Sequence, residues 1–206
     1  MTILPLTYLG NTEYFSLLLQ EECIIDLYEH YIKQSYRNRC EIMTATGTAA
    51  LTVNVVKGGS IVKRPVRDIQ IVSSKRWQHH HWTAITSAYR NSPYFDHYCD
   101  LFAPFYEKRF RFLADLNIPL AETIVKILGS PGSLRFSDSY VETSTGDTDL
   151  RGAFKPSADR TRMPPATHEY QQVFSDRQPF APNLSVIDLI FCEGPAAADI
   201  LRGSIR

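Results

Sequence analysis

The chain has 206 residues, of which 44% are hydrophobic and 21% are charged, so one globular domain over residues 1–206 is expected and intrinsic disorder is excluded. The 22 lysines and arginines balance the 22 aspartates and glutamates, which argues against a dedicated nucleic-acid-binding protein. No apolar stretch approaches the ~20 residues that span a bilayer, and the N-terminus lacks the basic start of a signal peptide, so we expect no membrane insertion and a cytoplasmic location.

The first part of the chain predicts a βαβ unit. Residues 3–9 have the pattern of a buried strand, residues 11–20 that of a capped helix, and residues 23–32 are rich in β-forming side chains. A strand, a helix and a strand within about 30 residues favour a right-handed parallel crossover. Two short strands around a Thr-Gly turn in residues 41–58 then predict a hairpin, and residues 67–74 alternate like one more strand.

The middle of the chain predicts helices. Residues 75–95 have helical periodicity, and a second helical stretch covers residues 101–129, with Pro104 in its first turn. Because proline removes a backbone donor and clashes with the preceding turn, Pro119 should divide this stretch into two helices that meet near Asn117.

Residues 130–182 are rich in proline and poor in periodic pattern, which predicts a long loop region inside the domain. Two short helices are expected after this loop, up to the end of the chain. The fold class is therefore α/β, with a mixed, partly parallel sheet made of the βαβ unit and the hairpin. The helices of residues 75–129 should cover this sheet.

The stretch SYRNRCEI at residues 35–42 holds Arg37, Asn38 and Arg39 in one predicted turn. Arginine forks match phosphate or carboxylate oxygens bidentately, so these three side chains are candidates for an anion site. The alternative is a surface corner where the arginines form weak ion pairs with Glu29 or Glu41. In the first case, Arg37→Ala should weaken anion binding and leave the melting temperature nearly unchanged.

Three consecutive histidines, residues 79–81, do not predict a metal site, because adjacent helical side chains diverge by about 100°. The four cysteines form no CxxC pair, so a zinc cluster is not expected either. His81 lies on one helical stripe with Trp77, Ile85 and Tyr89. It is either a core histidine or the candidate catalytic base.

Six segments, in order along the chain, carry a family resemblance: TYLGNTEYF, SYRNRCEI, LTVNVVKGGS, WQHHHWTAITSAYRNSPYFDHY, FLADLN and FAPNLSVIDLIFCEGP. They resemble conserved segments of the WbqC-like protein family, whose patterns include HQPxYxPxxGYF, LTVPVKxG, WxxxHxxxLxxxYxxxPYFxxY and FxPxLSIIDLLFNxGP. The matching residues include Tyr8, Asn38, Arg39, His81, Tyr89 and Tyr94.

The resemblance implies a transferase that acts on an activated sugar or acyl donor, glycyl included, in O-antigen or surface polysaccharide synthesis. The partner would be a small molecule or a nucleotide sugar; no cofactor can be named. Arg37, Asn38 and Arg39 would bind the donor's charged group, His81 would be the base, and Tyr8, Tyr89 and Tyr94 would line the pocket.

Two departures from the family pattern support a different hypothesis. Leu4, Pro5 and Leu6 replace the family's HQP, so its histidine is missing, and the Gly-rich SGxGGKDYL segment of longer members is absent. The alternative is a non-catalytic binding or assembly protein of the same pathway, for example a homodimer. The order strand, loop, helix, strand also resembles nucleotidyltransferase-like folds, where that loop and the helix N-terminus bind phosphates.

Overall fold

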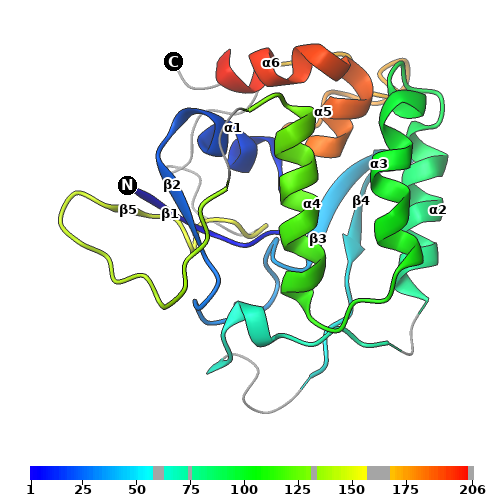
Figure 1. Cartoon of the computed structure of the whole chain (residues 1–206). Coiled ribbons are helices and arrows are strands. Elements are labelled where there is room, and N and C mark those ends of the chain that lie inside the picture. Colours follow the sequence, from blue (N-terminus) through cyan, green and yellow to red (C-terminus); the bar gives the residue numbers. More distant parts are fainter. Residues whose placement is uncertain (58–62, 74–75, 131–133, 157–167, 204–206) are drawn as a thin grey trace.

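Two small sheets organise the chain, seen here in a computed structural model that describes residues 1–57, 63–73, 76–130, 134–156 and 168–203 (Figure 1). The first sheet is parallel, with the strand order β2-β1-β5. The second is the antiparallel hairpin β3-β4. The strands are β1 (Thr2–Pro5), β2 (Cys23–Asp26), β3 (Arg39–Thr44), β4 (Gly47–Thr52) and β5 (Thr148–Asp149).

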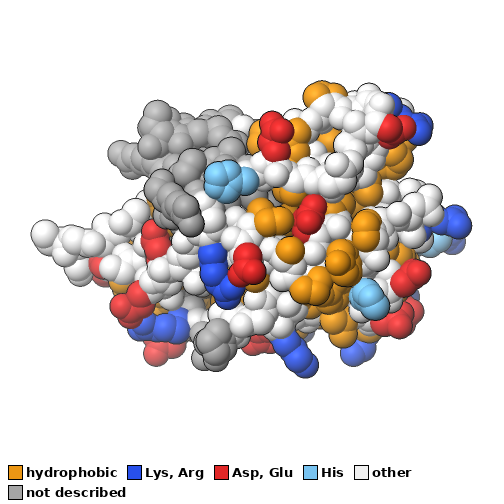
Figure 2. Space-filling view, turned by 90° about the horizontal axis from the view of Figure 1, so that it is seen from above, with side chains coloured by type: hydrophobic (Ala, Val, Ile, Leu, Met, Phe, Trp, Pro, Cys, Tyr) orange, Lys and Arg blue, Asp and Glu red, His pale blue; other side chains and the backbone are white. Residues whose placement is uncertain are grey.

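The helices pack around these sheets. They are α1 (Thr12–Gln20), α2 (Trp77–Tyr89), α3 (Phe95–Glu107), α4 (Leu113–Ile127), α5 (Val186–Glu193) and α6 (Ala197–Gly203). α4 passes in front of the hairpin, α2 and α3 pack side by side, and α5 and α6 lie above them (Figure 1). Viewed from above, acidic and basic side chains are intermixed on this face of the molecule (Figure 2).

The predicted mixed α/β class is confirmed, including the parallel β1–α1–β2 unit and the hairpin. α1 begins as predicted, because the side chain of Asn11 accepts a hydrogen bond from the backbone N–H of Tyr14. The Thr-Gly turn also holds, and Gly47 has a φ of 110° that suits glycine. β5 adds a third strand on the other side of β1, so β1 is central.

The expected helix break at Pro119 is wrong, because α4 continues through this residue. The fully buried Leu116 and Leu120 flank Pro119 in sequence, and their packing outweighs one lost backbone bond. The break lies at residues 108–112 instead. There the carbonyl of Arg111 accepts from the N–H of Ile71, which holds the segment in an extended conformation.

Three other element predictions need correction. Pro104 lies inside α3 and not in a first turn, because α3 already begins at Phe95. The described part of residues 67–74, up to residue 73, does not form a full strand: a 3-10 turn covers Val66–Asp68, and in this part Gln70 and Ile71 alone make isolated bridges. In the described part of residues 130–182, β5 is the one named strand, and Phe136 makes a single bridge to Ile25.

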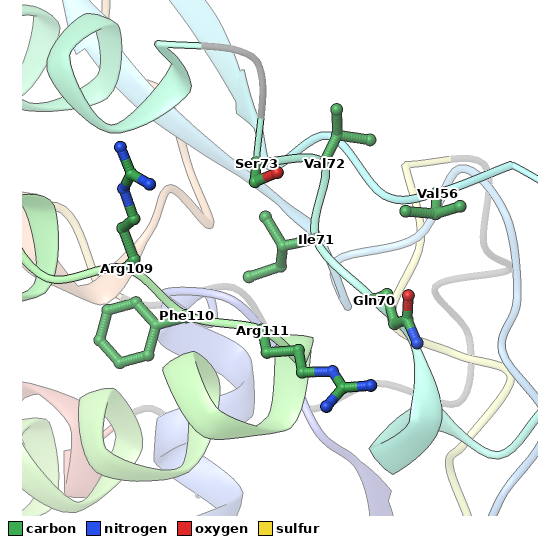
Figure 3. Close-up of a pocket in the computed structure, with 8 residues that line it drawn as sticks. All are labelled: Val56, Gln70, Ile71, Val72, Ser73, Arg109, Phe110 and Arg111. Atoms are coloured by element: carbon green, nitrogen blue, oxygen red, sulfur yellow. The ribbon is translucent and has the colours of Figure 1, made fainter.

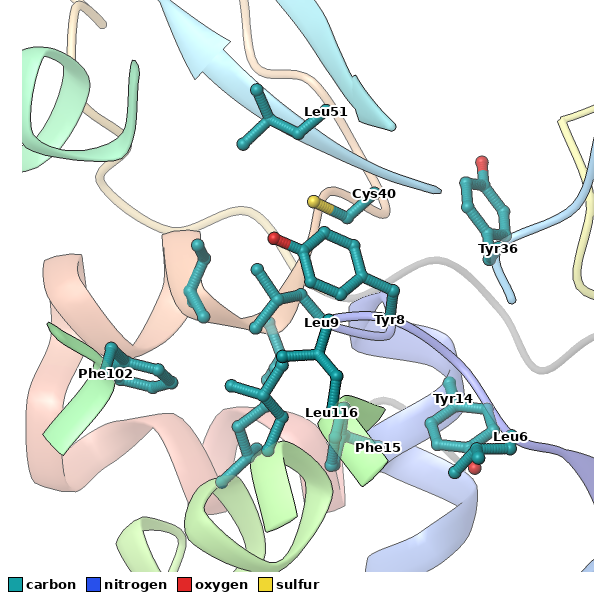
Figure 4. Close-up of a cluster of buried hydrophobic side chains, with 14 of the residues drawn as sticks. Leu6, Tyr8, Leu9, Tyr14, Phe15, Tyr36, Cys40, Leu51, Phe102 and Leu116 are labelled. Atoms are coloured by element: carbon teal, nitrogen blue, oxygen red, sulfur yellow. The ribbon is translucent and has the colours of Figure 1, made fainter. Parts of the chain in front are cut away.

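The main core lies between the parallel sheet, the hairpin and the helices. It contains Tyr8 and Leu9, from the loop after β1, and Phe15 of α1. These side chains share one cluster with Leu51 of β4 and Leu116 of α4 (Figure 4). The loop after β1 therefore points into the interior rather than toward solvent. This placement decides what its side chains can do.

Candidate functional site

The SYRNRC turn is braced from several distant parts of the chain. The carbonyl of Tyr36 accepts a hydrogen bond from the N–H of Tyr8, and the N–H of Tyr36 donates to Phe154. The amide nitrogen of Asn117 in α4 donates to the carbonyl of Arg37 at 2.8 Å. The turn is thus held between the β1 loop, α4 and the late loop, and its three polar side chains have fixed directions.

Arg37 points inward, with only 1% of its surface exposed. Its guanidinium donates to both carboxylate oxygens of Glu29, one of them at 2.9 Å, and to the carbonyl of Arg151 at 2.8 Å. Burial raises the pKa of Glu29 to about 7, although Arg37 opposes this shift. The sequence names Glu29 correctly as a partner, but the pair is internal and not exposed, so Arg37 reaches no ligand in this conformation.

Asn38 is also buried, and both ends of its amide are used. Its Oδ1 accepts from the hydroxyl of Tyr31 at 2.9 Å, and its Nδ2 donates to the carbonyl of Val53 at 2.8 Å. Burial raises the pKa of Tyr31 to about 12, so the phenol stays protonated and remains a donor. Asn38 therefore fixes the wall of a cavity that begins next to it.

Arg39 points the other way, into a cavity of about 440 Å³ with a partly open mouth. The cavity is lined by Tyr31, Lys33, Gln34, Asn38, Arg39, Thr52, Val53, Asn54, Val55 and Lys57. Three of these residues are cationic and, among the described lining residues, none is acidic. We call this cavity the basic pocket.

Arg39 is only partly neutralised. Its Nη2 lies 2.7 Å from Oε1 of Glu41, and its side chain is 35% exposed. Its Nε is buried and has no hydrogen-bond partner. A buried N–H donor without a partner costs stability. Because this Nε is buried, a ligand in the pocket would meet the exposed part of the guanidinium instead.

His81 lies beneath the hairpin, with 4% exposure. Its Nδ1 is 2.9 Å from the hydroxyl of Tyr8, which in turn is 3.0 Å from the hydroxyl of Tyr106. Burial lowers the pKa of His81 to about 4, and a hydrogen bond to the backbone of Thr52 opposes this shift. His81 is neutral at pH 7 and contacts the floor of the basic pocket through Thr52, without lining the pocket itself.

The structure does not bring the three predicted pocket tyrosines to the basic pocket. Tyr8 is fully buried in the main core. Tyr89 is also fully buried, donates to Asp188 at 2.7 Å and accepts from the N–H of Met43. Tyr94 packs on Gly194, where an added Cβ would lie 2.5 Å from the ring.

The N-terminus of α1 is closed by other parts of the chain. The N–H of Thr12 donates to the carbonyl of Leu184, that of Glu13 to the side chain of Asn183, and that of Tyr14 to Asn11. A helix N-terminus binds phosphate through such free N–H groups. The phosphate site of nucleotidyltransferase-like folds is therefore filled by the protein's own groups in this conformation.

Sequence reasoning missed Lys33, Thr52, Asn54 and Lys57. Lys57 lies in the segment LTVNVVKGGS, which carries the family resemblance but predicted no ligand contact. Lys33 had no signal, because only the tertiary fold brings residues 31–34 next to residues 52–57. No group of three or more metal-ligating side chains is present among the described residues. Nor does any helix in the described ranges have the length and apolarity to cross a membrane.

These features define an α/β protein with a small parallel sheet and a basic pocket beside its hairpin. The model of the WbqC-like protein family matches residues 7–153, and the chain belongs to this family. It is 27% identical over 227 aligned residues to the uncharacterized protein Rv1507c of Mycobacterium tuberculosis, covering 98% of this chain and 97% of that protein. No solved structure matches the chain significantly.

Proposed function

We propose that this chain binds a small, negatively charged donor in the basic pocket and transfers a sugar or acyl group, a glycyl group included, in O-antigen or surface polysaccharide synthesis. One observation supports the binding step above all others. Lys33, Arg39 and Lys57 line one cavity, and no described lining residue carries a negative charge. The pathway and the transfer step rest on the family resemblance.

In this proposal the three cations bind the phosphate or carboxylate of the donor. Arg39 can donate from its partly exposed guanidinium to the oxygens of the anion. Lys33 and Lys57 also line the pocket, and each brings a compact ammonium charge on a flexible side chain to the anion. Tyr31, Val53 and Val55 offer an apolar wall for the uncharged part of the donor. Arg37 and Asn38 support the site by fixing the turn that carries Arg39.

His81 stays the sequence's candidate base, but its geometry favours a positioning role. Its low pKa makes it a weak base, and the hydroxyl of Tyr8 occupies its Nδ1. Its hydrogen bond to the backbone of Thr52 fixes the floor of the basic pocket. We expect His81 to affect the affinity for the donor through this floor rather than to accept a proton from an acceptor.

A second candidate function is non-catalytic binding of the same class of ligand. One observation favours it: the described lining residues include no histidine, aspartate or glutamate to act as a general base. The chain would then bind a donor or an intermediate for a partner enzyme. This reading also fits the replacement of the family's HQP by Leu4, Pro5 and Leu6.

The test is a thermal-shift panel of the purified protein with ATP, nucleotide sugars, acyl-coenzyme A compounds and free amino acids. A ligand at 100 times its Kd stabilises the fold by about 2.7 kcal/mol, which gives a clear shift. Arg39→Ala, which we expect to weaken the affinity about 10-fold or more, should cut that shift to about half or less. Arg177→Ala is the matched control, because Arg177 forms an exposed pair with Asp176 outside the pocket. An undiminished shift in Arg39→Ala would contradict binding in the basic pocket.

The same ligand then separates the two functions. A transferase converts the donor when a hydroxyl or amine acceptor is added, and mass spectrometry detects the product. A binding protein shows the shift and forms no product with any acceptor. Absence of a shift with all donors would contradict both functions.

A further inference from the structure

A second cavity, of about 480 Å³, adjoins the same segment of chain as the basic pocket. Val56 lines this second cavity, whereas its neighbours Val55 and Lys57 line the basic pocket. The second cavity is lined by Val56, Gln70, Ile71, Val72, Ser73, Arg109, Phe110 and Arg111 (Figure 3). Two of these residues are arginines and none is acidic. We call it the arginine cavity.

The walls of the arginine cavity are held by backbone pairing. The N–H of Val56 donates to the carbonyl of Gln70, and the N–H of Ile71 donates to that of Arg111. These hydrogen bonds place three short extended segments side by side: residues 54–56, 70–72 and 109–111. The same pairing that breaks the predicted long helix therefore positions both arginines.

The two arginines have no charged partner within the described ranges of the chain. Seven of the ten other described arginines lie within 4.0 Å of a carboxylate: Arg37, Arg39, Arg67, Arg135, Arg151, Arg177 and Arg202. Arg64, Arg76 and Arg90 likewise have no ion pair among the described residues, but they do not line this cavity. Arg111 contacts only the ring of Phe112, at 5.0 Å, and Arg109 makes no described polar contact. Two unpaired guanidinium groups beside one cavity produce a positive field that attracts anions.

The directions of the side chains decide the shape of the ligand. The guanidinium groups of Arg109 and Arg111 extend apart, the first toward the Ser73 end and the second toward Gln70 (Figure 3). Ile71 lies between these two ends. Each end therefore combines an arginine fork with a hydroxyl or an amide, and the middle is apolar. This arrangement does not enclose one small anion.

We propose that the arginine cavity binds an elongated ligand with a carboxylate or phosphate at each end and an uncharged middle. One acidic group pairs with Arg109 and the other with Arg111, because guanidinium forks match the oxygens of both groups. Gln70 and Ser73 donate to or accept from hydroxyl groups next to the charges. The inference is independent of the proposed function, since it uses none of the residues of the basic pocket.

The test is a titration of ¹⁵N-labelled protein followed by amide resonances. The probes are glutarate, a disaccharide of two uronic acids, and a sugar bisphosphate, with acetate and a neutral disaccharide as controls. We expect at least one dianionic probe to shift the amides of Gln70, Ser73 and Arg111, with at least ~10-fold higher affinity than the controls. Comparing the carboxylate and phosphate probes shows which charged group is preferred.

Two single variants and one distant variant make the test decisive. Arg109→Gln and Arg111→Gln should each weaken the preferred probe about 10-fold. Both side chains are exposed, so the fold should persist. Arg39→Gln should leave the affinity unchanged. The proposal is overturned if no dianion shifts these amides, if both single variants bind like the parent chain, or if Arg39→Gln weakens binding equally.

Discussion

Arg37 and Arg39 lie two residues apart in one turn, yet they occupy opposite surroundings. Arg37 is 1% exposed and shares a buried network with Glu29 and Arg151, whereas Arg39 is partly exposed at the mouth of the basic pocket. Residues i and i+2 of one strand share a face, so strand alternation does not separate them. Arg37 lies in the turn before β3, whereas Arg39 is the first residue of β3. Arginine chemistry is the same in both places, so the surroundings alone decide which residue stabilises the fold and which can bind a ligand.

The buried network extends to the late loop. Arg151 donates to Asp26 at 2.7 Å and to Asp149 at 2.7 Å, and Asp26 is fully buried at the end of β2. The loop region is therefore anchored to the parallel sheet by charge pairs. The basic pocket has no comparable network, because its cations outnumber its one acidic neighbour, Glu41.

The largest effect is expected from Arg37→Ala, which leaves the carboxylate of Glu29 buried without its partner. Breaking a buried ion pair costs about 3–5 kcal/mol, so urea unfolding should show a large loss of stability. This reverses the expectation from the sequence alone that the melting temperature would hardly change. The loss should grow as the pH rises above about 7, because there the parent chain holds the ion pair, whereas the variant must bury the carboxylate without its partner or keep it protonated.

The double variant Arg37→Met with Glu29→Leu is the control for this prediction. It removes both charges and should recover much of the lost stability, since apolar replacement of a buried pair is often tolerated. A single variant as stable as the parent chain would show that Arg37 does not hold the turn. The comparison between Arg37 and Arg39 would then fail.

Arg151→Ala should cost about 3 kcal/mol, because Asp26 loses its cationic partner in the interior. Asp26 keeps hydrogen bonds from Tyr28 and Ser137, which limit the loss. The loop between residues 134 and 156 should also become sensitive to limited proteolysis. Arg177→Ala, which breaks only an exposed pair, should change stability by less than about 0.5 kcal/mol.

The variant His81→Gln removes the side chain that hydrogen-bonds the backbone of Thr52 in the basic pocket, and its effect on stability should depend on pH. The folded pKa of His81 is about 4 and its ordinary value is 6.5, so the unfolded chain binds the proton first as pH falls. Stability from this group is complete above pH 6.5 and is lost between pH 6.5 and 4, by up to about 3 kcal/mol. Glu29 and Asp188 also have raised pKa values, but their effect on stability is the same in the parent chain and in His81→Gln.

The measurement for His81 is the difference between the two stability curves from pH 8 to pH 4. The parent chain should lose more stability than His81→Gln over the acid range. Parallel curves would mean that His81 is accessible to protons in the folded state. That outcome would return it to the role of candidate catalytic base.

Arg39→Ala should have the smallest effect on stability, within about 0.5 kcal/mol, because it breaks one partly exposed pair. Its effect on ligand affinity should be about 10-fold or more. Isothermal titration with the ligand found in the thermal-shift panel measures this. A strong loss of stability with unchanged affinity would place Arg39 with Arg37 as a structural residue.

The sequence by itself determined the local elements. Asn11 caps α1 and the Thr-Gly turn closes the hairpin, because each of these depends on neighbouring residues. The family match over residues 7–153 holds five of the six segments that resemble the family. Capping and turn formation are short-range effects that do not require the rest of the fold. The class of the sheet followed from the order of these elements.

Only the tertiary structure decided where the side chains go. The long helix breaks at residues 108–112 because Ile69 and Ile71 pair with that backbone, and not at Pro119. Lys33 and Lys57 meet Arg39 only after the chain has folded, and the same folding buries Arg37. For His81 the helical stripe it shares with Trp77 and Tyr89 already indicated an inward position. The burial of a charged turn and long-range backbone pairing, in contrast, leave no pattern in the nearby sequence.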